Sequence, residues 1–130
     1  MCIFCKIINN EIPSYKVYED EEIIAILDIS QLTYGHTLIM PKKHYDNFWQ
    51  ADPQTISKIM NKANEVSQLI CQKLNSKGCN IFTNTNEVAG QTVLHWHVHI
   101  LPRYENDDFK INEISHDYNK EEILKKIKGE

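Results

Sequence analysis

The apolar residues of this chain fall into short runs that predict five β-strands. Residues 15–19 alternate between polar and apolar, as a half-buried strand does, whereas residues 22–28 form a mostly continuous apolar run, which is typical of a strand covered on both faces. Gly35 and Pro41 bracket a third run. The predicted strands span residues 15–19, 22–28, 37–40, 79–83 and 93–101.

One long helix is predicted between the third and fourth strands. Asp52 suits the N-cap and Pro53 suits the first helical position. Apolar residues then recur with a period near 3.6 over residues 56–74, and Gly78 is expected to end the helix. A short helix is predicted over 120–128. With few parallel crossovers, the pattern indicates an α+β fold, an antiparallel sheet with helices packed on one side.

Composition and charge restrict the class of protein. The chain has 130 residues, 42% apolar and 25% charged, which is typical of a folded protein, and we expect a single domain over residues 1–130. A net charge of −4 disfavours binding of a nucleic-acid polymer, which needs a clustered basic surface. No apolar run approaches the roughly 20 residues of a membrane span, and no secretory signal is recognisable. A cytoplasmic protein with reduced cysteines is expected.

Three histidines alternate with apolar residues in the sequence His-Trp-His-Val-His. Side chains at i, i+2 and i+4 of a strand share a face. His95, His97 and His99 should therefore project together, each about 6–7 Å from the next, while Trp96 and Val98 anchor the opposite face in the core. The strand is then a rigid platform for imidazoles.

Three interpretations of this histidine run compete. It can be a polar strand face, a three-histidine metal site, or a catalytic site with separate roles for each ring. Three rings in a row on one strand span about 13 Å, too far for all of them to reach one Zn²⁺ through bonds of about 2.0–2.1 Å. Catalysis is the favoured interpretation.

The middle histidine suits nucleophilic attack on phosphorus. Neutral imidazole is available near pH 7, since its unperturbed pKa is about 6.5, and a covalent intermediate splits one difficult displacement into two. His97 has an imidazole on either side. In the preceding segment, Gly90 permits close approach of the backbone to a phosphate, and Gln91 and Thr92 supply hydrogen-bond donors.

The Cys-x-x-Cys pair of Cys2 and Cys5 admits several interpretations. On its own it is half of a structural zinc site, which needs four ligands. A redox motif of this spacing normally opens a helix in a thioredoxin-like βαβ unit, which the predicted elements lack. Two ordinary buried thiols are the remaining alternative.

The heptad over residues 95–101 matches in full the pattern His-φ-His-φ-His-φ-φ, where φ is apolar. With it, the chain resembles the histidine-triad (HIT) superfamily, in its histidine-triad nucleotide-binding branch. The resemblance covers about residues 2–104 and leaves residues 105–130 as a tail with a short helix. Upstream segments that also look like bacterial-type members are residues 2–8, 27–30, 35–39 and 41–44.

The resemblance implies a HIT-like fold, a five-stranded antiparallel sheet with one long and one short helix, assembled as a homodimer. It implies a hydrolase that cleaves the α-phosphate bond of nucleoside phosphoramidates, acyl-adenylates or dinucleoside polyphosphates. A purine nucleotide of the AMP type is the expected ligand. The alternative is a nucleotide-binding module that recognises partners and has little turnover. His99 stands where a nucleotidyltransferase branch has Gln, which favours water as the acceptor.

The resemblance also implies roles for single residues. His97 would attack phosphorus and form a nucleotidyl-histidine, with His36 supporting the site from behind. Asp28 and Ile29 would meet ribose and base. Residues expected at the phosphate are Asn84, Gly90, Gln91, Thr92 and His99. Thr92 replaces a serine that is common in the branch and keeps its hydroxyl.

Some bacterial-type members of the family carry zinc, and the matching positions here are Cys2, Cys5, His44 and His95. This Cys₂His₂ set is chemically suitable for structural zinc. It implies that the first triad histidine holds the metal and that the other two serve the nucleotide. The triad would then be two adjoining sites on one strand.

Overall fold

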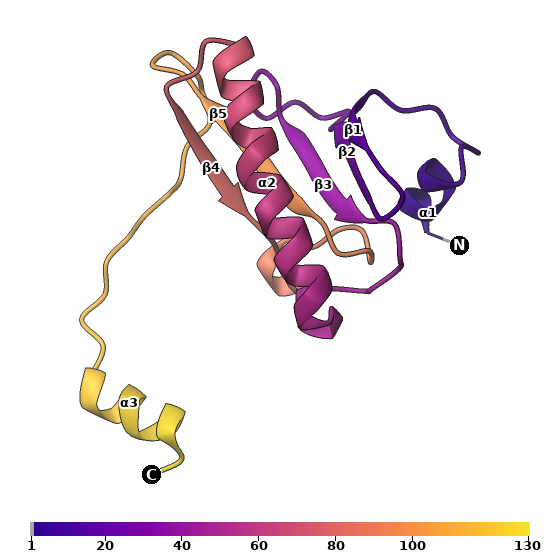
Figure 1. Cartoon of the computed structure of the whole chain (residues 1–130). Coiled ribbons are helices and arrows are strands. Elements are labelled where there is room, and N and C mark those ends of the chain that lie inside the picture. The colour runs from indigo at the N-terminus through magenta and orange to yellow at the C-terminus, as the bar shows by residue number, and fades with distance from the viewer. Residues whose placement is uncertain (1) are drawn as a thin grey trace.

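Five β-strands form a single antiparallel sheet in a computed structural model that describes residues 2–130 (Figure 1). The strand order is β1-β2-β3-β5-β4, so β5 lies between β3 and β4. The predicted five-stranded sheet is confirmed. The strands are β1 (Lys16–Glu19), β2 (Ile23–Leu27), β3 (Thr37–Pro41), β4 (Gly78–Phe82) and β5 (Val98–Arg103).

The long helix α2 (Pro53–Lys73) packs across one face of the sheet (Figure 1). It begins as predicted, because the Asp52 carboxylate accepts a hydrogen bond of 2.7 Å from the Thr55 amide. Its buried stripe contacts strand residues of the alternate, inward-facing set. The prediction that Gly78 ends the helix is wrong: the turn is made by Asn75, with φ of 59°, and Gly78 opens β4.

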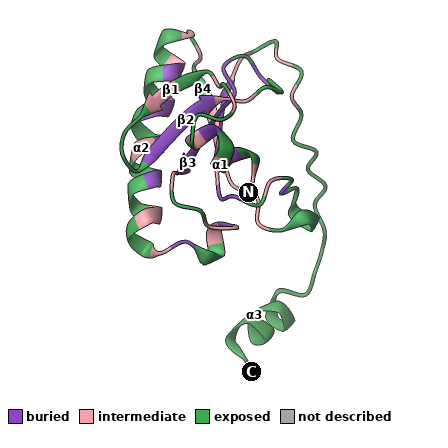
Figure 2. Cartoon of the chain, turned by 90° about the vertical axis from the view of Figure 1, so that its right-hand side faces the viewer, coloured by how far each residue is buried: buried purple, intermediate pink, exposed green. Residues whose placement is uncertain are grey.

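A second helix that the sequence patterns missed, α1 (Ile3–Ile8), packs on the opposite face. There, Phe4 and Ile7 form one buried cluster with apolar residues of β2 and with Leu38 and Met40 of β3. The prediction of helices on one side only is therefore wrong. Six residues are too few to show a helical period. The two-sided burial of β2 and β3 agrees with the apolar run of β2 and is visible in Figure 2.

The remaining helical elements are short. A 3₁₀ turn, η1 (Phe48–Gln50), precedes α2, and another, η2 (Glu87–Ala89), lies in the loop after β4. The predicted C-terminal helix is present as α3 (Lys120–Lys128), which extends away from the sheet (Figure 1). Over residues 2–130, no helix is long and apolar enough to cross a membrane.

The histidine strand is shorter than predicted, since β5 begins at Val98 and not at residue 93. The amide of Trp96 donates a 2.7 Å hydrogen bond to the carbonyl of Tyr45 in a loop, instead of to a neighbouring strand. Alternation nevertheless holds: Trp96, Val98 and Ile100 all lie in the core under α2. The histidines therefore lie on β5 and on the irregular segment before it, in which residues 93–95 form a bend.

Gly35 is required where the chain turns into β3. Its φ is +93°, and an added Cβ would lie 2.4 Å from Leu74 Cδ1. We expect Gly35→Ala to lower the free energy of unfolding by about 2–3 kcal/mol, from backbone strain of about 1–2 kcal/mol and crowding of Leu74. Gly78→Ala is the matched control, because nothing lies within 4 Å of its Cβ position. Urea unfolding of both variants tests this; equal effects would contradict it.

Candidate active site and metal centre

The triad histidines lie on the face of the sheet that α1 covers. His97 and His99 have ring centroids 5.0 Å apart. The Phe4 ring meets His97 edge-on, with centroids 5.0 Å apart, and also contacts His95 at 6.0 Å. Strand alternation explains this arrangement, because the residues between the histidines face α2. Phe4 was missed by the sequence analysis, and a lone aromatic near the N-terminus gives no signal of such a contact.

His97 has a defined tautomer. Its Nδ1 lies 2.7 Å from the carbonyl oxygen of His95. A carbonyl only accepts, so Nδ1 carries the proton and Nε2 holds a free lone pair. Burial lowers the pKa of His97 below its ordinary value. The ring is therefore neutral near pH 7, with one nitrogen available for attack.

His36 and His99 form a hydrogen-bonded pair beside it. Their Nε2 and Nδ1 atoms lie 2.9 Å apart. The other nitrogen of His36 lies 3.0 Å from the Ser30 carbonyl and farther, 3.3 Å, from the Leu32 amide. The shorter contact is with an acceptor, so His36 Nδ1 is protonated and His99 Nδ1–H donates to His36. His99 then presents the lone pair of Nε2.

Besides its hydrogen bond to His36, the His99 ring is held by a stacking contact. Phe82, its cross-strand neighbour on β4, stacks on it with centroids 4.7 Å apart. Burial lowers the pKa of His99 to about 4, so the ring is neutral near pH 7. Its partner His36 is buried.

Asp28 completes this group without making it a metal site. Its Oδ2 lies 3.6 Å from His36 Nε2, and its Oδ1 accepts the Ser30 amide. The His36–His99 ring centroids are 5.2 Å apart, the separation of two rings joined end to end by one hydrogen bond. Two nitrogens facing each other at 2.9 Å leave no room for an ion with bonds of about 2.0–2.1 Å to each. His36 and His99 are joined by one hydrogen bond, and Asp28 lies beside them at a distance too long for another.

The first residue of the loop between β4 and β5 lies beside His97. Thr83 donates to the carbonyl of His97 at 2.7 Å, and Asn84 follows directly. Gly90 has φ of +98°, a left-handed conformation that favours glycine, and its carbonyl lies 3.5 Å from the side-chain amide nitrogen of Asn84. Thr92 is exposed. Of the residues predicted at the phosphate, Asn84 and Gly90 are thus in contact with each other.

Gln91 lies in the same loop but differs in its contacts. Its side chain is buried. The amide group donates to the carbonyls of Asp46 and Val93, at 2.6 and 3.0 Å, and accepts from the Asn86 amide at 2.8 Å. With these bonds made, the side chain holds the loop in place and has no donor left for a phosphate.

A second cluster brings together Cys2, Cys5, His44 and His95. Sulfur-to-Nδ1 distances are 3.4–3.7 Å, and the two Nδ1 atoms are 3.2 Å apart. Tetrahedral Zn²⁺, with bonds of about 2.3 Å to sulfur and 2.0–2.1 Å to nitrogen, would set sulfur and nitrogen about 3.6 Å apart and two nitrogens about 3.3 Å apart. The four side chains therefore fit a tetrahedral metal ion.

The outer contacts of this cluster also suit a metal. His44 Nε2 lies 2.7 Å from Asp46 Oδ1, and His95 Nε2 lies 2.8 Å from the carbonyl of Pro41. Such partners place the proton on Nε2 and leave Nδ1 free for a metal. The Cys5 amide donates to Cys2 Sγ, which caps α1. The Cys-x-x-Cys pair thus lies at the start of a helix, as in the redox motif. It lacks the βαβ unit of that motif, and its sulfurs lie beside two histidines.

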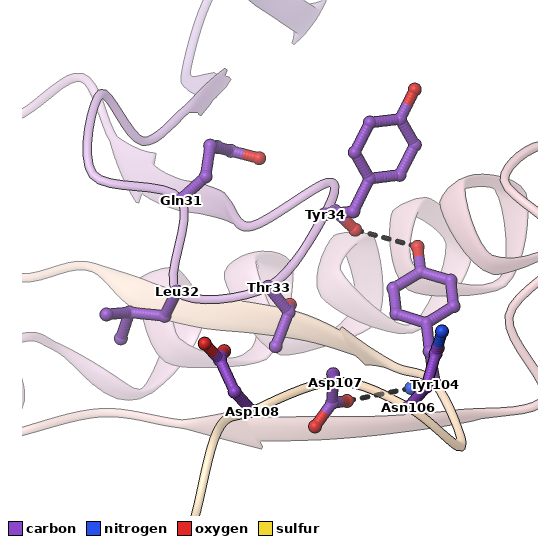
Figure 3. A pocket seen from close by; sticks show the side chains of 8 residues that line it. All are labelled: Gln31, Leu32, Thr33, Tyr34, Tyr104, Asn106, Asp107 and Asp108. Carbon is purple, nitrogen blue, oxygen red and sulfur yellow. Dashed lines mark hydrogen bonds between the residues drawn. The ribbon is translucent and has the colours of Figure 1, made fainter.

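A large hollow in the described part of the chain lies elsewhere. It measures about 590 Å³ and is open to solvent between the loop after β2 and the segment after β5 (Figure 3). Tyr104 donates to the carbonyl of Tyr34 across it, at 2.7 Å. Asp107 is already paired with Arg103, and none of the triad histidines lines the hollow. Ile29, expected at the base of the nucleotide, is 92% exposed.

Comparison with known proteins identifies close relatives. Residues 9–106 match the HIT domain family. An uncharacterized HIT-like protein of Methanocaldococcus jannaschii is 45% identical, over 99% of this chain and all of the relative. Adenylylsulfatase HINT3 of Arabidopsis thaliana is 40% identical, over 82% of this chain and 54% of that protein.

Solved structures agree with the fold. A HIT-family protein of Bacillus subtilis superposes with a TM-score of 0.91 and 40% identity, over 98% of this chain and 93% of that one. A zinc-bound histidine-triad family protein of Mycobacterium smegmatis superposes with a TM-score of 0.80 and 34% identity, over 93% and 86% of the two chains.

Proposed function

Because the chain belongs to the HIT family, we propose that it is a nucleotide hydrolase that cleaves at the α-phosphorus through a nucleotidyl-His97 intermediate. The observation that carries the proposal is the fixed tautomer of His97. Its Nδ1–H is held by the His95 carbonyl, which leaves Nε2 as a neutral nucleophile beside His99. A member of the same family is an adenylylsulfatase, which supports an adenylyl group as the transferred part.

The first displacement forms a bond between His97 Nε2 and the α-phosphorus and breaks the bond to the leaving group. An amine must take up a proton as its bond to phosphorus breaks, and that proton is assigned to solvent water, whereas sulfate or phosphate leaves as an anion and needs none. The exposed Thr92 hydroxyl is assigned to donate to the phosphate oxygens. The backbone amides of residues 89–91 already donate to carbonyls within their own loop and are not assigned as donors to the phosphate. The His95 carbonyl stabilises the positive charge on the substituted imidazole ring.

The second displacement uses water. Water attacks the same phosphorus, the bond to Nε2 breaks, and neutral His97 is restored with release of a nucleoside monophosphate. His99 Nε2 carries the free lone pair, because its Nδ1–H donates to His36, and we assign it the proton of the attacking water. His36 is a positioning residue that fixes this tautomer.

The nucleoside is assigned to the loop after β2. Asp28 keeps Oδ2 free of backbone bonds, so it can accept from ribose hydroxyls. Ile29 offers an exposed apolar side chain on which a purine can stack. Asn84, Gly90 and Thr92 are assigned to the phosphate, and Gln91 is reassigned from phosphate contact to support of their loop.

We further propose that the four-residue cluster holds a structural Zn²⁺. All four tetrahedral positions are filled by protein, so the ion has none left for substrate. Its ligands join α1 to the segment that precedes β5, and α1 carries Phe4 against His97. The metal would thereby hold one wall of the active site. The zinc-bound relative supports this choice of ion.

A homodimer is also part of the proposal. Strand β4 is an edge of the sheet, and its Ile81 is 40% exposed. An unprotected edge strand with an exposed apolar side chain suits pairing with a second copy.

A substrate panel tests the activity. We expect release of AMP from adenosine 5′-phosphoramidate, adenylyl sulfate and diadenosine polyphosphates, measured by chromatography. The substrate that is cleaved fastest identifies the preferred leaving group. Tight AMP binding with no turnover of any of them would overturn the hydrolase and favour a nucleotide-binding module.

The pH dependence follows from the pKa of His97. Burial favours the neutral ring, so its folded pKa lies below the ordinary value of about 6.5. The His97 ring therefore stays neutral as pH falls from 8 to 6.5. It is protonated, and so loses its nucleophilic lone pair, only at lower pH. We expect kcat/KM to be flat over that range, with an acid limb centred below 6.5. Metal content measured in the same samples controls for acid release of the ion; a midpoint at or above pH 6.5 would contradict this.

A further inference from the structure

The C-terminal arm, residues 109–130, leaves the body of the protein and does not return to it (Figures 1 and 2). It is anchored at Phe109, whose carbonyl accepts from Arg103 at 2.9 Å. From residue 110 onward every residue is exposed. Over residues 111–130, the described hydrogen bonds and ion pairs all lie within α3 and its caps. Nothing in the same chain holds this helix in place.

The arm nevertheless carries exposed apolar side chains of the kind that usually pack in an interface. Ile123, Leu124 and Ile127 share one face of α3 and are 42–77% exposed. The extended part adds Ile111, Ile114 and Tyr118, all exposed. Exposed apolar side chains gathered on one helix face mark a contact surface.

The helix itself is well formed for its length. Asn119 caps its N-terminus, Gly129 ends it in the left-handed conformation, and Glu122 pairs with Lys126. Isolated helices shorter than about 12–15 residues are marginal in water even with good sequences, and α3 has 9. Packing of its apolar face against another surface is what would keep it folded.

The position of the arm indicates a second copy of this chain as that surface. The arm departs on the side of β4, one of the two edge strands of the sheet (Figure 1). Residues 109–119 alone can extend about 36 Å. The superposition with the B. subtilis structure covers 98% of this chain, and the arm beyond residue 110 is about 15% of it, so the relative shares the outstretched arm.

Charge agrees with this choice. Helix α3 has four lysines and two glutamates, a charge of +2, whereas the body, residues 1–108, has nine Lys and Arg against thirteen Asp and Glu, a charge of −4. Two copies that exchange arms would each place a basic helix on an acidic body. We propose that α3 packs through Ile123, Leu124 and Ile127 on a second copy across the β4 edge, and that the exchange is reciprocal, as two-fold symmetry requires.

Matched variants of the full chain test the arm. In wild type, amide hydrogen exchange should show α3 protected at concentrations where light scattering gives a dimer. The double variant Ile123→Glu, Ile127→Glu should lose that protection by about 100-fold or more. Lys125→Glu makes the same charge change of −2 on the opposite face of α3 and should keep it.

Cross-linking decides which chain the arm contacts. A photoreactive group at position 124, in a mixture of ¹⁵N-labelled and unlabelled protein, should give peptides that join labelled to unlabelled chains. Three results would each overturn the proposal. They are cross-links within one chain only, a dimer in which α3 is unprotected, and a monomer in which α3 is protected. Turnover of nucleotides is not needed for any of these readouts, so they are independent of the proposed hydrolase.

Discussion

His97→Ala is expected to lower kcat for AMP release from adenosine 5′-phosphoramidate by about 10³-fold or more. The variant removes the imidazole whose Nε2 is assigned the attack on phosphorus, with Nδ1–H held by the His95 carbonyl. His99 does not substitute for it, because the stacking of its ring on Phe82 and its hydrogen bond to His36 hold it where it is assigned the proton of the attacking water. Steady-state kinetics with the purified variant measures the effect.

The control for this variant is His116→Ala, the same substitution at an exposed histidine in the arm. It should change kcat by less than about twofold. Binding of AMP to His97→Ala, followed by calorimetry, should persist within a few-fold of wild type, because the proposed ribose and phosphate contacts come from other residues. A variant that folds, binds AMP and still turns over at the wild-type rate would remove His97 from the mechanism.

The second large effect concerns the metal. We expect Cys5→Ser to abolish stoichiometric zinc and to lower Tm by about 10–20 °C. A ligand present at about 1,000 times its Kd adds about 4 kcal/mol, and for a chain of this size each kcal/mol moves Tm by about 3–5 °C. Because α1 presents Phe4 to His97, kcat should fall as well. Thermal unfolding and elemental analysis measure both quantities.

Cys71→Ser is the matched control for this loss, since Cys71 lies on α2, outside the cluster. It should retain one equivalent of zinc and most of the stability. Less than about half an equivalent of zinc in carefully prepared wild-type protein would count against the metal site. So would equal Tm values for the Cys5→Ser variant and wild type.

Strand alternation predicted much of this site from sequence. It placed Trp96 and Val98 in the core, and His97 and His99 on one face, and the contacts with Phe4 and Phe82 agree with that. It could not predict that the strand proper begins at Val98, because the loss of pairing before it depends on the Tyr45 carbonyl, 51 residues away in sequence.

Local patterns were less informative about loops and short helices. Gln91 reads as a phosphate donor when only its neighbours are considered, yet its partners include the carbonyl of Asp46 on a distant loop. Helix α1 has one turn and a half, so no period could reveal it. The convergence of Cys2 with His95 depends on the sheet order and on α1, and no spacing in the sequence specifies it.

The stereochemistry at phosphorus tests the central claim most directly. Each in-line displacement inverts the configuration, so two displacements give net retention and one gives inversion. Hydrolysis of an adenosine phosphoramidate made chiral at the α-phosphorus with sulfur, in water labelled with ¹⁸O, reports the outcome in the product. A covalent nucleotidyl-His97 predicts retention; inversion would show direct attack by water and would contradict it.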